Sequence, residues 1–192
     1  MSRRARERRG SIRVVSGELG GRRIDTPPGD ATRPTSDRVR EAVFNALDST
    51  AAVEGARALD VYAGSGALGI EALSRGAAHV TFAEVESHAR EVIVDNLRSL
   101  DLTGRAEVTS GDGATAVARP PAGGWDLVFL DPPYAFDDWA DVLAVVRDHL
   151  AEEGVAVVES IADVELPEGM HATRSKRYGG TVVLFATRGA PE

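Results

Sequence analysis

Short apolar runs alternate with amphipathic segments between residues 56 and 160. The apolar runs are typical of strands: ARALDVYA, HVTFAEV, AEVTS, WDLVFLD and GVAVVES. Between them, residues 68–75, 88–100, 114–118 and 138–150 place apolar side chains at helical spacing. This alternation predicts βαβ units, and therefore a mostly parallel sheet with helices on both faces.

The two ends of the chain have different patterns. Residues 11–29 indicate two short strands around a glycine-rich turn, and a helical pattern follows from Ser36, a residue type that caps helix N-termini. Residues 170–188 contain two strand patterns joined by Gly179-Gly180, a strong hairpin signal. We therefore predict a doubly wound α/β fold with a mostly parallel seven-stranded sheet. It carries a C-terminal antiparallel hairpin and a small N-terminal extension made of a β-hairpin and a helix.

Composition removes several classes of site. The chain has 192 residues, enough for one domain with a substantial core, and it has no cysteine. Disulfides, thiolate zinc sites and cysteine nucleophiles are thereby excluded, and the four scattered histidines predict no metal site. No apolar stretch approaches the roughly eighteen residues of a membrane span, and the basic N-terminus lacks the apolar segment of a secretory signal. We expect a cytoplasmic protein without membrane contact.

Charge is unevenly distributed along the chain. The net charge is −8, yet residues 1–40 contain eleven arginines and five acidic residues, whereas the rest contains eleven basic and twenty-five acidic residues. This asymmetry predicts a tail over residues 1–10, an extension over 11–50 and a main domain over 51–192. The tail is equally well explained as flexible and merely solvated. Because arginines continue beyond it and arginine neutralises phosphates, we expect the basic arm to contact a polyanion.

The stretch DVYAGSGALG, residues 60–69, contains Gly64-x-Gly66-x-x-Gly69 between a predicted strand and a predicted helix. Glycines let the backbone turn tightly and approach a ligand without side-chain clashes. NAD and S-adenosylmethionine both use such turns. Glu84 ends the next strand, where a carboxylate can accept hydrogen bonds from both ribose hydroxyls of either cofactor. Glu86 is the alternative for this role.

Two further carboxylates belong to the predicted cofactor cleft. Asp60 precedes the glycine turn and could take part in binding a cationic amino group, directly or through water. The pyrophosphate of NAD would be a poor neighbour for it, because both groups are anionic. Asp112, after the third strand, is placed where it could meet an adenine amino group, although Gly-Asp-Gly is also a plain turn.

The sequence VFLDPPY, residues 128–134, favours S-adenosylmethionine over NAD. An apolar strand runs into Asp131-Pro132-Pro133-Tyr134 beside the predicted cleft, and the two prolines stiffen this turn. A nucleobase amine is a weak nucleophile, because its lone pair is delocalised into the ring. We expect the Asp131 carboxylate and the Pro132 carbonyl to accept its two hydrogens, while Tyr134 stacks on the base. The C-terminal hairpin agrees, because methyltransferases of the doubly wound class end in this way.

These motifs resemble the RsmD family of bacterial methyltransferases. The resemblance rests on RPTSDRVREAVFNAL, DVYAGSGALGIEALSRGA, FLDPPY and KRYGGTVVLF, and covers about residues 11–187. It implies methylation of guanine N2 in 16S ribosomal RNA, with S-adenosylmethionine as the cofactor. It also implies the residue roles: Asp60, Gly64, Gly66, Glu84 and Asp112 for the cofactor, Asp131, Pro132, Pro133 and Tyr134 for the guanine amine, and Arg33, Arg38 and Arg40 for RNA phosphates.

The substrate and the competing functions stay open at this point. We expect a monomer that acts on a small-subunit particle, because a compact domain with one basic face cannot easily read a long RNA. The nearest alternative is a DNA adenine-N6 methylase, which normally needs a further recognition domain. An NAD-dependent oxidoreductase and a non-enzymatic RNA-binding assembly factor are the others. The former would leave the Asp-Pro-Pro-Tyr turn without a role.

Overall fold

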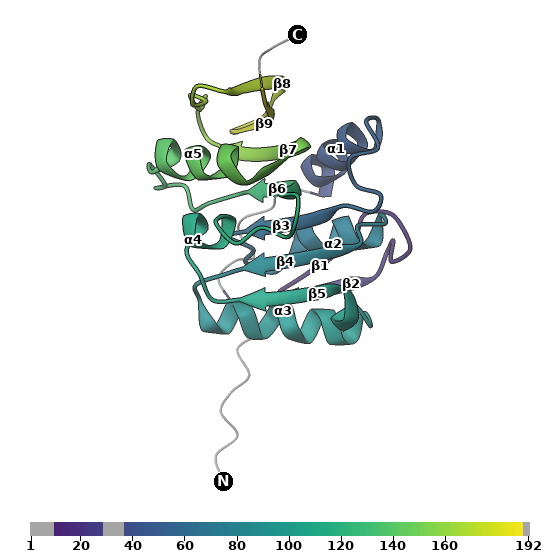
Figure 1. The fold of residues 1–192 in the computed structure, drawn as a ribbon. Coiled ribbons are helices and arrows are strands. Elements are labelled where there is room, and N and C mark those ends of the chain that lie inside the picture. Colours follow the sequence, from purple (N-terminus) through teal and green to yellow (C-terminus); the bar gives the residue numbers. More distant parts are fainter. Residues whose placement is uncertain (1–9, 29–36, 190–192) are drawn as a thin grey trace.

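The computed structural model describes residues 10–28 and 37–189, and its centre is a seven-stranded sheet (Figure 1). The strand order is β5-β4-β3-β6-β7-β9-β8. Strands β3 to β7 run parallel, whereas β9 lies antiparallel between β7 and β8. Their bounds are β3 (Arg57–Val61), β4 (His79–Ala83), β5 (Ala106–Thr109), β6 (Trp125–Leu130), β7 (Leu150–Ser160), β8 (Met170–Tyr178) and β9 (Thr181–Arg188).

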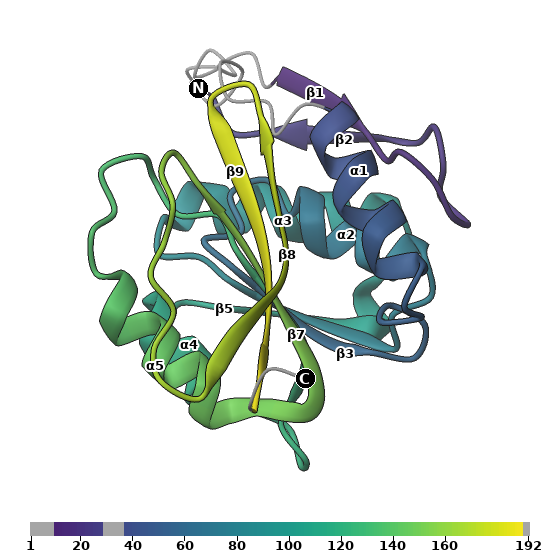
Figure 2. The ribbon, with the colours of Figure 1, turned by 90° about the horizontal axis from the view of Figure 1, so that it is seen from above.

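Helices cover both faces of this sheet (Figure 2). On one face lie α1 (Asp37–Asp48), α2 (Ala67–Ser74) and α3 (Ser87–Ser99), and on the other lie α4 (Gly113–Val117) and α5 (Trp139–His149). A short 3-10 helix, η2, spans Thr103–Arg105. The predicted class of fold, including the antiparallel C-terminal hairpin, is confirmed.

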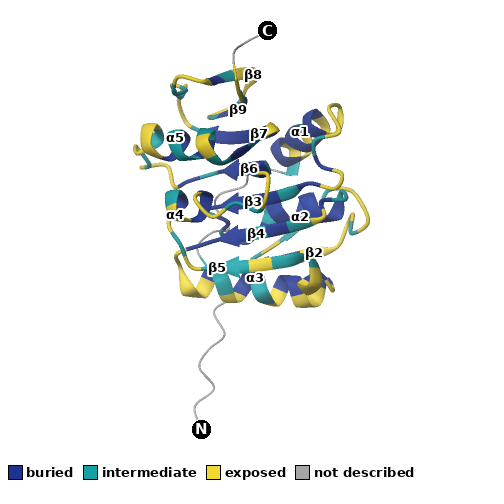
Figure 3. Cartoon of the chain, viewed as in Figure 1, coloured by how far each residue is buried: buried dark blue, intermediate teal, exposed yellow. Residues whose placement is uncertain are grey.

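The central strands are largely buried (Figure 3), and they are apolar on both faces because each face meets a helical layer. In β6, Leu127 and Phe129 join the core under α1, α2 and α3, whereas Val128 and Leu130 join the core under α4 and α5. All four side chains are fully buried. The carboxyl ends of the parallel strands lie at the same edge of the sheet, and the loops that follow them form the site.

The N-terminal extension packs against the helices of the first face. It consists of the antiparallel pair β1 (Gly10–Arg13) and β2 (Arg23–Thr26), followed by α1. Between β1 and β2, the backbone N–H groups of Val15 and Ser16 donate to the buried carboxylate of Glu71 on α2, at 2.7 and 3.0 Å. The extension therefore shares its core with α2, the helix that follows the glycine turn.

The strand predicted over residues 154–160 begins earlier, at Leu150, because a register shift against Trp125 lets Glu152 and Glu153 stay in the strand with exposed side chains. The predicted cap Ser36 lies outside the described residues, as do residues 1–9 of the tail. Among the helices that the structure describes, none is both long enough and apolar enough to cross a membrane.

Candidate active site

The glycine turn joins β3 to α2 at the carboxyl edge of the sheet. Gly64 and Gly66 have φ values of 54° and 79°, in the left-handed region where glycine carries no steric penalty. Tyr62 has a φ of 61° in the same turn, a strained conformation for a residue with a side chain. Gly66 is the N-cap residue of α2 and has no side chain that could cap the helix. The turn therefore places backbone groups, rather than side chains, along the edge.

Glu84 holds this turn from the end of β4. Its Oε2 accepts a hydrogen bond from Gly64 N–H at 2.8 Å, and its Oε1 accepts one from Glu86 N–H at 2.9 Å. Glu84 is 8% exposed, whereas Glu86 is exposed at the N-terminus of α3. The geometry therefore favours Glu84 over Glu86 as the carboxylate that belongs to the cleft.

Asp60 is buried beneath the turn. Its Oδ2 accepts a hydrogen bond from Gly69 N–H at 2.8 Å, which ties the first turn of α2 to β3. The pKa of Asp60 is raised to about 8, chiefly by burial, with smaller contributions from the charges of Asp131 and Glu84 and an opposing one from the Gly69 hydrogen bond. Asp60 is 2% exposed, so its observed contacts are structural, and its binding of a cofactor amino group stays a prediction.

Asp112 lies at the start of α4, after β5. Its Oδ1 accepts a hydrogen bond from Thr115 N–H at 2.8 Å, and this bond lowers the pKa of the Asp112 carboxyl. Asp112 thus caps a helix while its side chain stays exposed.

The pKa of Tyr62 is raised to about 12, chiefly by burial, and the negative charges of Asp112 and Asp138 contribute to this increase. Tyr62 therefore lies close to both acidic loops.

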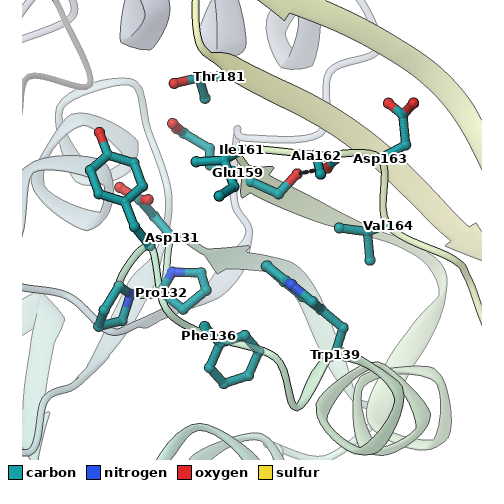
Figure 4. Close-up of a pocket in the computed structure, with 13 residues that line it drawn as sticks. Asp131, Pro132, Phe136, Trp139, Glu159, Ile161, Ala162, Asp163, Val164 and Thr181 are labelled. Carbon is teal, nitrogen blue, oxygen red and sulfur yellow. Dashed lines mark hydrogen bonds between the residues drawn. The ribbon is translucent and has the colours of Figure 1, made fainter.

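A cavity of about 250 Å³ opens at the Asp-Pro-Pro-Tyr turn after β6 (Figure 4). The predicted residues Asp131, Pro132, Pro133 and Tyr134 all line it. Pro132 is buried, and Tyr134 is 63% exposed. The structure therefore brings the four residues together in one pocket, and Tyr134 is the aromatic residue among them.

Aromatic packing supports the loop that carries this turn. The Phe136 ring packs against Tyr62 at 5.4 Å between centroids, and against Trp139 at 4.9 Å in an edge-on arrangement. Phe136 and Trp139 also line the pocket. Tyr62 comes from the glycine turn, so this cluster joins the two motifs that the sequence identifies separately.

The opposite wall of the pocket comes from the end of β7 and the loop after it, and no sequence motif predicted this wall. It contains Glu159, Ser160, Ile161, Ala162, Asp163 and Val164, with Thr181 from β9. Glu159 is the buried acidic residue of this wall, at 4% exposure. Only the order of the strands places it beside Asp131, because β7 pairs with β6.

Of the three arginines expected to contact RNA, Arg40 is wrongly assigned. It is 2% exposed, its Nη2 donates to the Arg13 carbonyl and to Asp37, and its Nε lies 3.7 Å from Glu71. A guanidinium enclosed by these partners cannot reach an external phosphate. Arg40 instead joins α1 to β1 and α2. Arg33 lies outside the described residues.

Arg38 is exposed and lines a groove between α1 and the C-terminal hairpin. Lys176, Arg177 and Tyr178 form the other wall, with the Lys176 ammonium 5.1 Å from the centre of the Tyr178 ring. Arg177 also donates to the carbonyl of Ile161, a residue of the pocket wall. The basic groove therefore adjoins the pocket. Its hairpin half was not predicted, because Lys176 and Arg177 are far in the sequence from the arginine-rich arm.

Comparison with known proteins places this arrangement in a family. The family model described as "Conserved hypothetical protein 95" matches residues 12–187. The chain belongs to this family. Ribosomal RNA small subunit methyltransferase D of Escherichia coli is 36% identical over 160 residues, which cover 82% of this chain and 79% of that one. The resemblance to the RsmD family is thereby confirmed.

Other relatives agree over most of the chain. The Bacillus subtilis protein YlbH is 39% identical over 186 residues, covering 93% of this chain and all of that one. Among solved structures, Escherichia coli yhhF superimposes with a TM-score of 0.82 at 34% identity, covering 95% of this chain and all of that one. The family and the fold identify the chain as a methyltransferase of the class I architecture.

Proposed function

We propose that this protein transfers a methyl group from S-adenosylmethionine to the exocyclic N2 of a guanine in small-subunit ribosomal RNA. The observation that carries the proposal is the pocket at Asp131-Pro132-Pro133-Tyr134, joined through Tyr62 and Phe136 to the glycine turn. The relatives named as small-subunit rRNA methyltransferases supply the class of substrate.

The residues of the cleft fit this cofactor. Glu84 already accepts hydrogen bonds from two backbone N–H groups, and its carboxylate oxygens keep lone pairs for ribose hydroxyls. Gly64 and Gly66 let the chain approach the ligand, and the exposed Asp112 suits an adenine amino group. These acidic side chains favour a cationic sulfonium cofactor over an anionic pyrophosphate. When bound, S-adenosylmethionine supplies an electrophilic methyl group on positively charged sulfur.

The pocket residues act on the guanine amine. Asp131 and the carbonyl of Pro132 accept hydrogen bonds from the two amine hydrogens. These bonds reduce the delocalisation of the nitrogen lone pair into the ring and make the nitrogen a better nucleophile. As the amine acquires positive charge during attack, the Asp131 carboxylate stabilises that charge. Tyr134 stacks on the base, and the rigid Pro132-Pro133 turn keeps these acceptors in place.

The basic groove is proposed to hold the RNA backbone. Arg38 on α1 and Lys176 and Arg177 on the hairpin are exposed and border one groove, which adjoins the pocket through Ile161. Residues 11–50 would then form the RNA-facing extension of the main domain, and Arg33 stays a candidate for the same role. Neutralising one side chain that binds a phosphate should reduce the slope of log affinity against log salt by about 1.

Purified protein and labelled S-adenosylmethionine test this function. We expect methyl incorporation into small-subunit RNA, greater when the RNA is in an assembling particle than when it is naked, and release of N2-methylguanosine on digestion. Incorporation into DNA but not into ribosomal RNA or subunits would contradict the proposal and favour an adenine-N6 methylase.

Lys176→Gln tests the role of the basic groove and should weaken RNA binding without changing S-adenosylhomocysteine binding. Glu153→Gln, at an exposed position on β7, is the control and should change neither.

A further inference from the structure

Glu159 is a buried acidic residue in the pocket that the proposed chemistry does not yet use. It lies near the end of β7 and is 4% exposed, and it lines the same cavity as Asp131 (Figure 4). Leu130 of β6 pairs in parallel with Val158 of β7, so the next residues along the two strands are Asp131 and Glu159. The sheet therefore places two carboxylates side by side, at the ends of adjacent parallel strands.

Apolar residues lie before Glu159 in β7 and opposite it on β9. Val157 and Val158 precede it in β7, and its partner on β9 is Val183, all of them buried. The side chain of Glu159, however, lines the cavity together with Asp131 and Ser160 (Figure 4). A ligand that presents hydrogen-bond donors would therefore meet two acidic side chains in this cavity.

Guanine presents such donors on one edge. Its N1–H and its N2 amino group lie next to each other, whereas adenine presents a lone pair at N1. An ionised carboxylate can only accept hydrogen bonds. Two carboxylates in one pocket therefore match the N1–H and N2–H groups of guanine together, and one of them would oppose the lone pair of a base without a hydrogen on N1. Enzymes that act on extruded bases commonly read this edge.

We propose that Glu159 determines specificity for guanine, by accepting the N1–H of the target base while Asp131 accepts a hydrogen of its N2 amine. This inference rests on the proposed function. It assigns different tasks to the two carboxylates, because Asp131 touches the nitrogen that reacts and Glu159 touches the neighbouring ring nitrogen. Glu159 is thus a residue of recognition, and its replacement should affect the choice of base more than the binding of cofactor.

The test uses 2-aminopurine, which keeps the 2-amino group but has no hydrogen on N1. Small-subunit RNA is prepared by ligation with guanine, 2-aminopurine or 6-thioguanine at the methylated nucleotide, and is offered within reconstituted particles. The wild-type protein should prefer guanine over 2-aminopurine on the order of 10²-fold in kcat/KM. It should accept 6-thioguanine, which keeps N1–H, within about 10-fold of guanine.

Glu159→Gln should reduce the preference for guanine over 2-aminopurine to less than about 10-fold, because its amide can donate to the bare N1. Glu159→Asp should keep the preference at a lower rate, and Glu153→Gln should leave both rate and preference unchanged. S-adenosylhomocysteine affinity and thermal unfolding show that each variant is folded.

Three results would overturn the assignment. The wild type could methylate guanine and 2-aminopurine equally well, Glu159→Gln could keep the full preference, or 6-thioguanine could be rejected as strongly as 2-aminopurine. The last result would place discrimination at C6 of the base. Failure of the wild type to methylate guanine in any particle would instead remove the proposed function, and this inference with it.

Discussion

The two halves of the carboxyl edge use the same kind of side chain for different purposes. At the ends of β3 and β4, Asp60 and Glu84 accept hydrogen bonds from the backbone N–H groups of Gly69 and Gly64. At the ends of β6 and β7, Asp131 and Glu159 line a cavity. The observed contacts of the first pair fix the shape of a turn, and Glu84 is also proposed to bind the cofactor ribose. The second pair lines the cavity that is proposed to receive the base.

The first half of the edge therefore holds the fold together, and the second half is proposed to carry out methyl transfer. The anchored half continues into α2, where Glu71 binds the N-terminal extension, so the glycine turn and the extension share one set of fixed contacts. The open half depends on the aromatic cluster of Tyr62, Phe136 and Trp139 to hold its loop. Changes in the first half should therefore alter stability and cofactor affinity, and changes in the second half should alter the methyl-transfer rate.

The largest effect is expected for Arg40→Met in the anchored half. The substitution removes a buried cation beside Glu71 and Asp37, and removal of one partner of a buried ion pair costs about 3–5 kcal/mol. Urea unfolding measures this change. The exposed neighbour Arg38→Met should change the free energy of unfolding by less than about 0.5 kcal/mol and should weaken RNA binding instead. An Arg40→Met protein of wild-type stability would show that this network does not anchor the extension.

Asp131→Asn tests the open half. The amide keeps the shape but lacks the negative charge that stabilises the developing cation, so kcat should fall by roughly 10²–10³-fold. Isothermal titration should show unchanged S-adenosylhomocysteine affinity. If cofactor affinity and rate fell together, Asp131 would belong with the anchoring carboxylates, and the separation of the two halves would be wrong.

Glu84→Gln tests the proposed link between anchoring and cofactor binding. The variant would lack one of the two hydrogen bonds to backbone N–H groups and the charge-assisted hydrogen bonds to ribose. Hydrogen bonds to a charged group contribute about 1.5–3 kcal/mol, so S-adenosylhomocysteine should bind roughly 10–100-fold more weakly. Glu86→Gln, exposed at the start of α3, is the matched control and should bind within about 2-fold of wild type. A larger reduction of affinity in Glu86→Gln would assign the ribose to Glu86.

The smallest change, expressed per pH unit, concerns Asp60. Its pKa is about 8 in the folded chain, against an ordinary value of 3.8, so between these pH values the folded state holds a proton that the unfolded state has released. The free energy of unfolding should therefore fall as pH rises through this window, by at most about 1.4 kcal/mol per pH unit. In Asp60→Asn, whose amide oxygen can still accept from Gly69, this slope should disappear. Parallel pH profiles in denaturant unfolding would contradict the raised pKa.

Contiguous motifs were predictable from the sequence, because a turn and the residues that it presents are local. The glycine turn and Asp131-Pro132-Pro133-Tyr134 lie where the alternation of strands and helices predicts them, at the carboxyl ends of β3 and β6. The hairpin at Gly179-Gly180 was equally local. The sheet order itself follows from connections that many sequences share.

Pairings between distant segments were not predictable in this way. Arg40 has the pattern of an exposed arginine on a helix, and nothing near it in the sequence indicates that Glu71 of α2 will enclose it. Glu159 follows a run of apolar strand residues and has the appearance of a strand end. Its place beside Asp131 appears only when β7 is paired with β6. Likewise, the basic groove combines α1 with a hairpin from the other end of the chain.

The most direct test of the central claim is mass-spectrometric mapping of small-subunit ribosomal RNA from cells that lack this protein. The account predicts that one N2-methylguanosine is missing, that the wild-type gene restores it, and that Asp131→Asn, although it binds S-adenosylhomocysteine, does not. An unchanged set of modified guanines in the deletion strain, or full restoration by Asp131→Asn, would contradict the account.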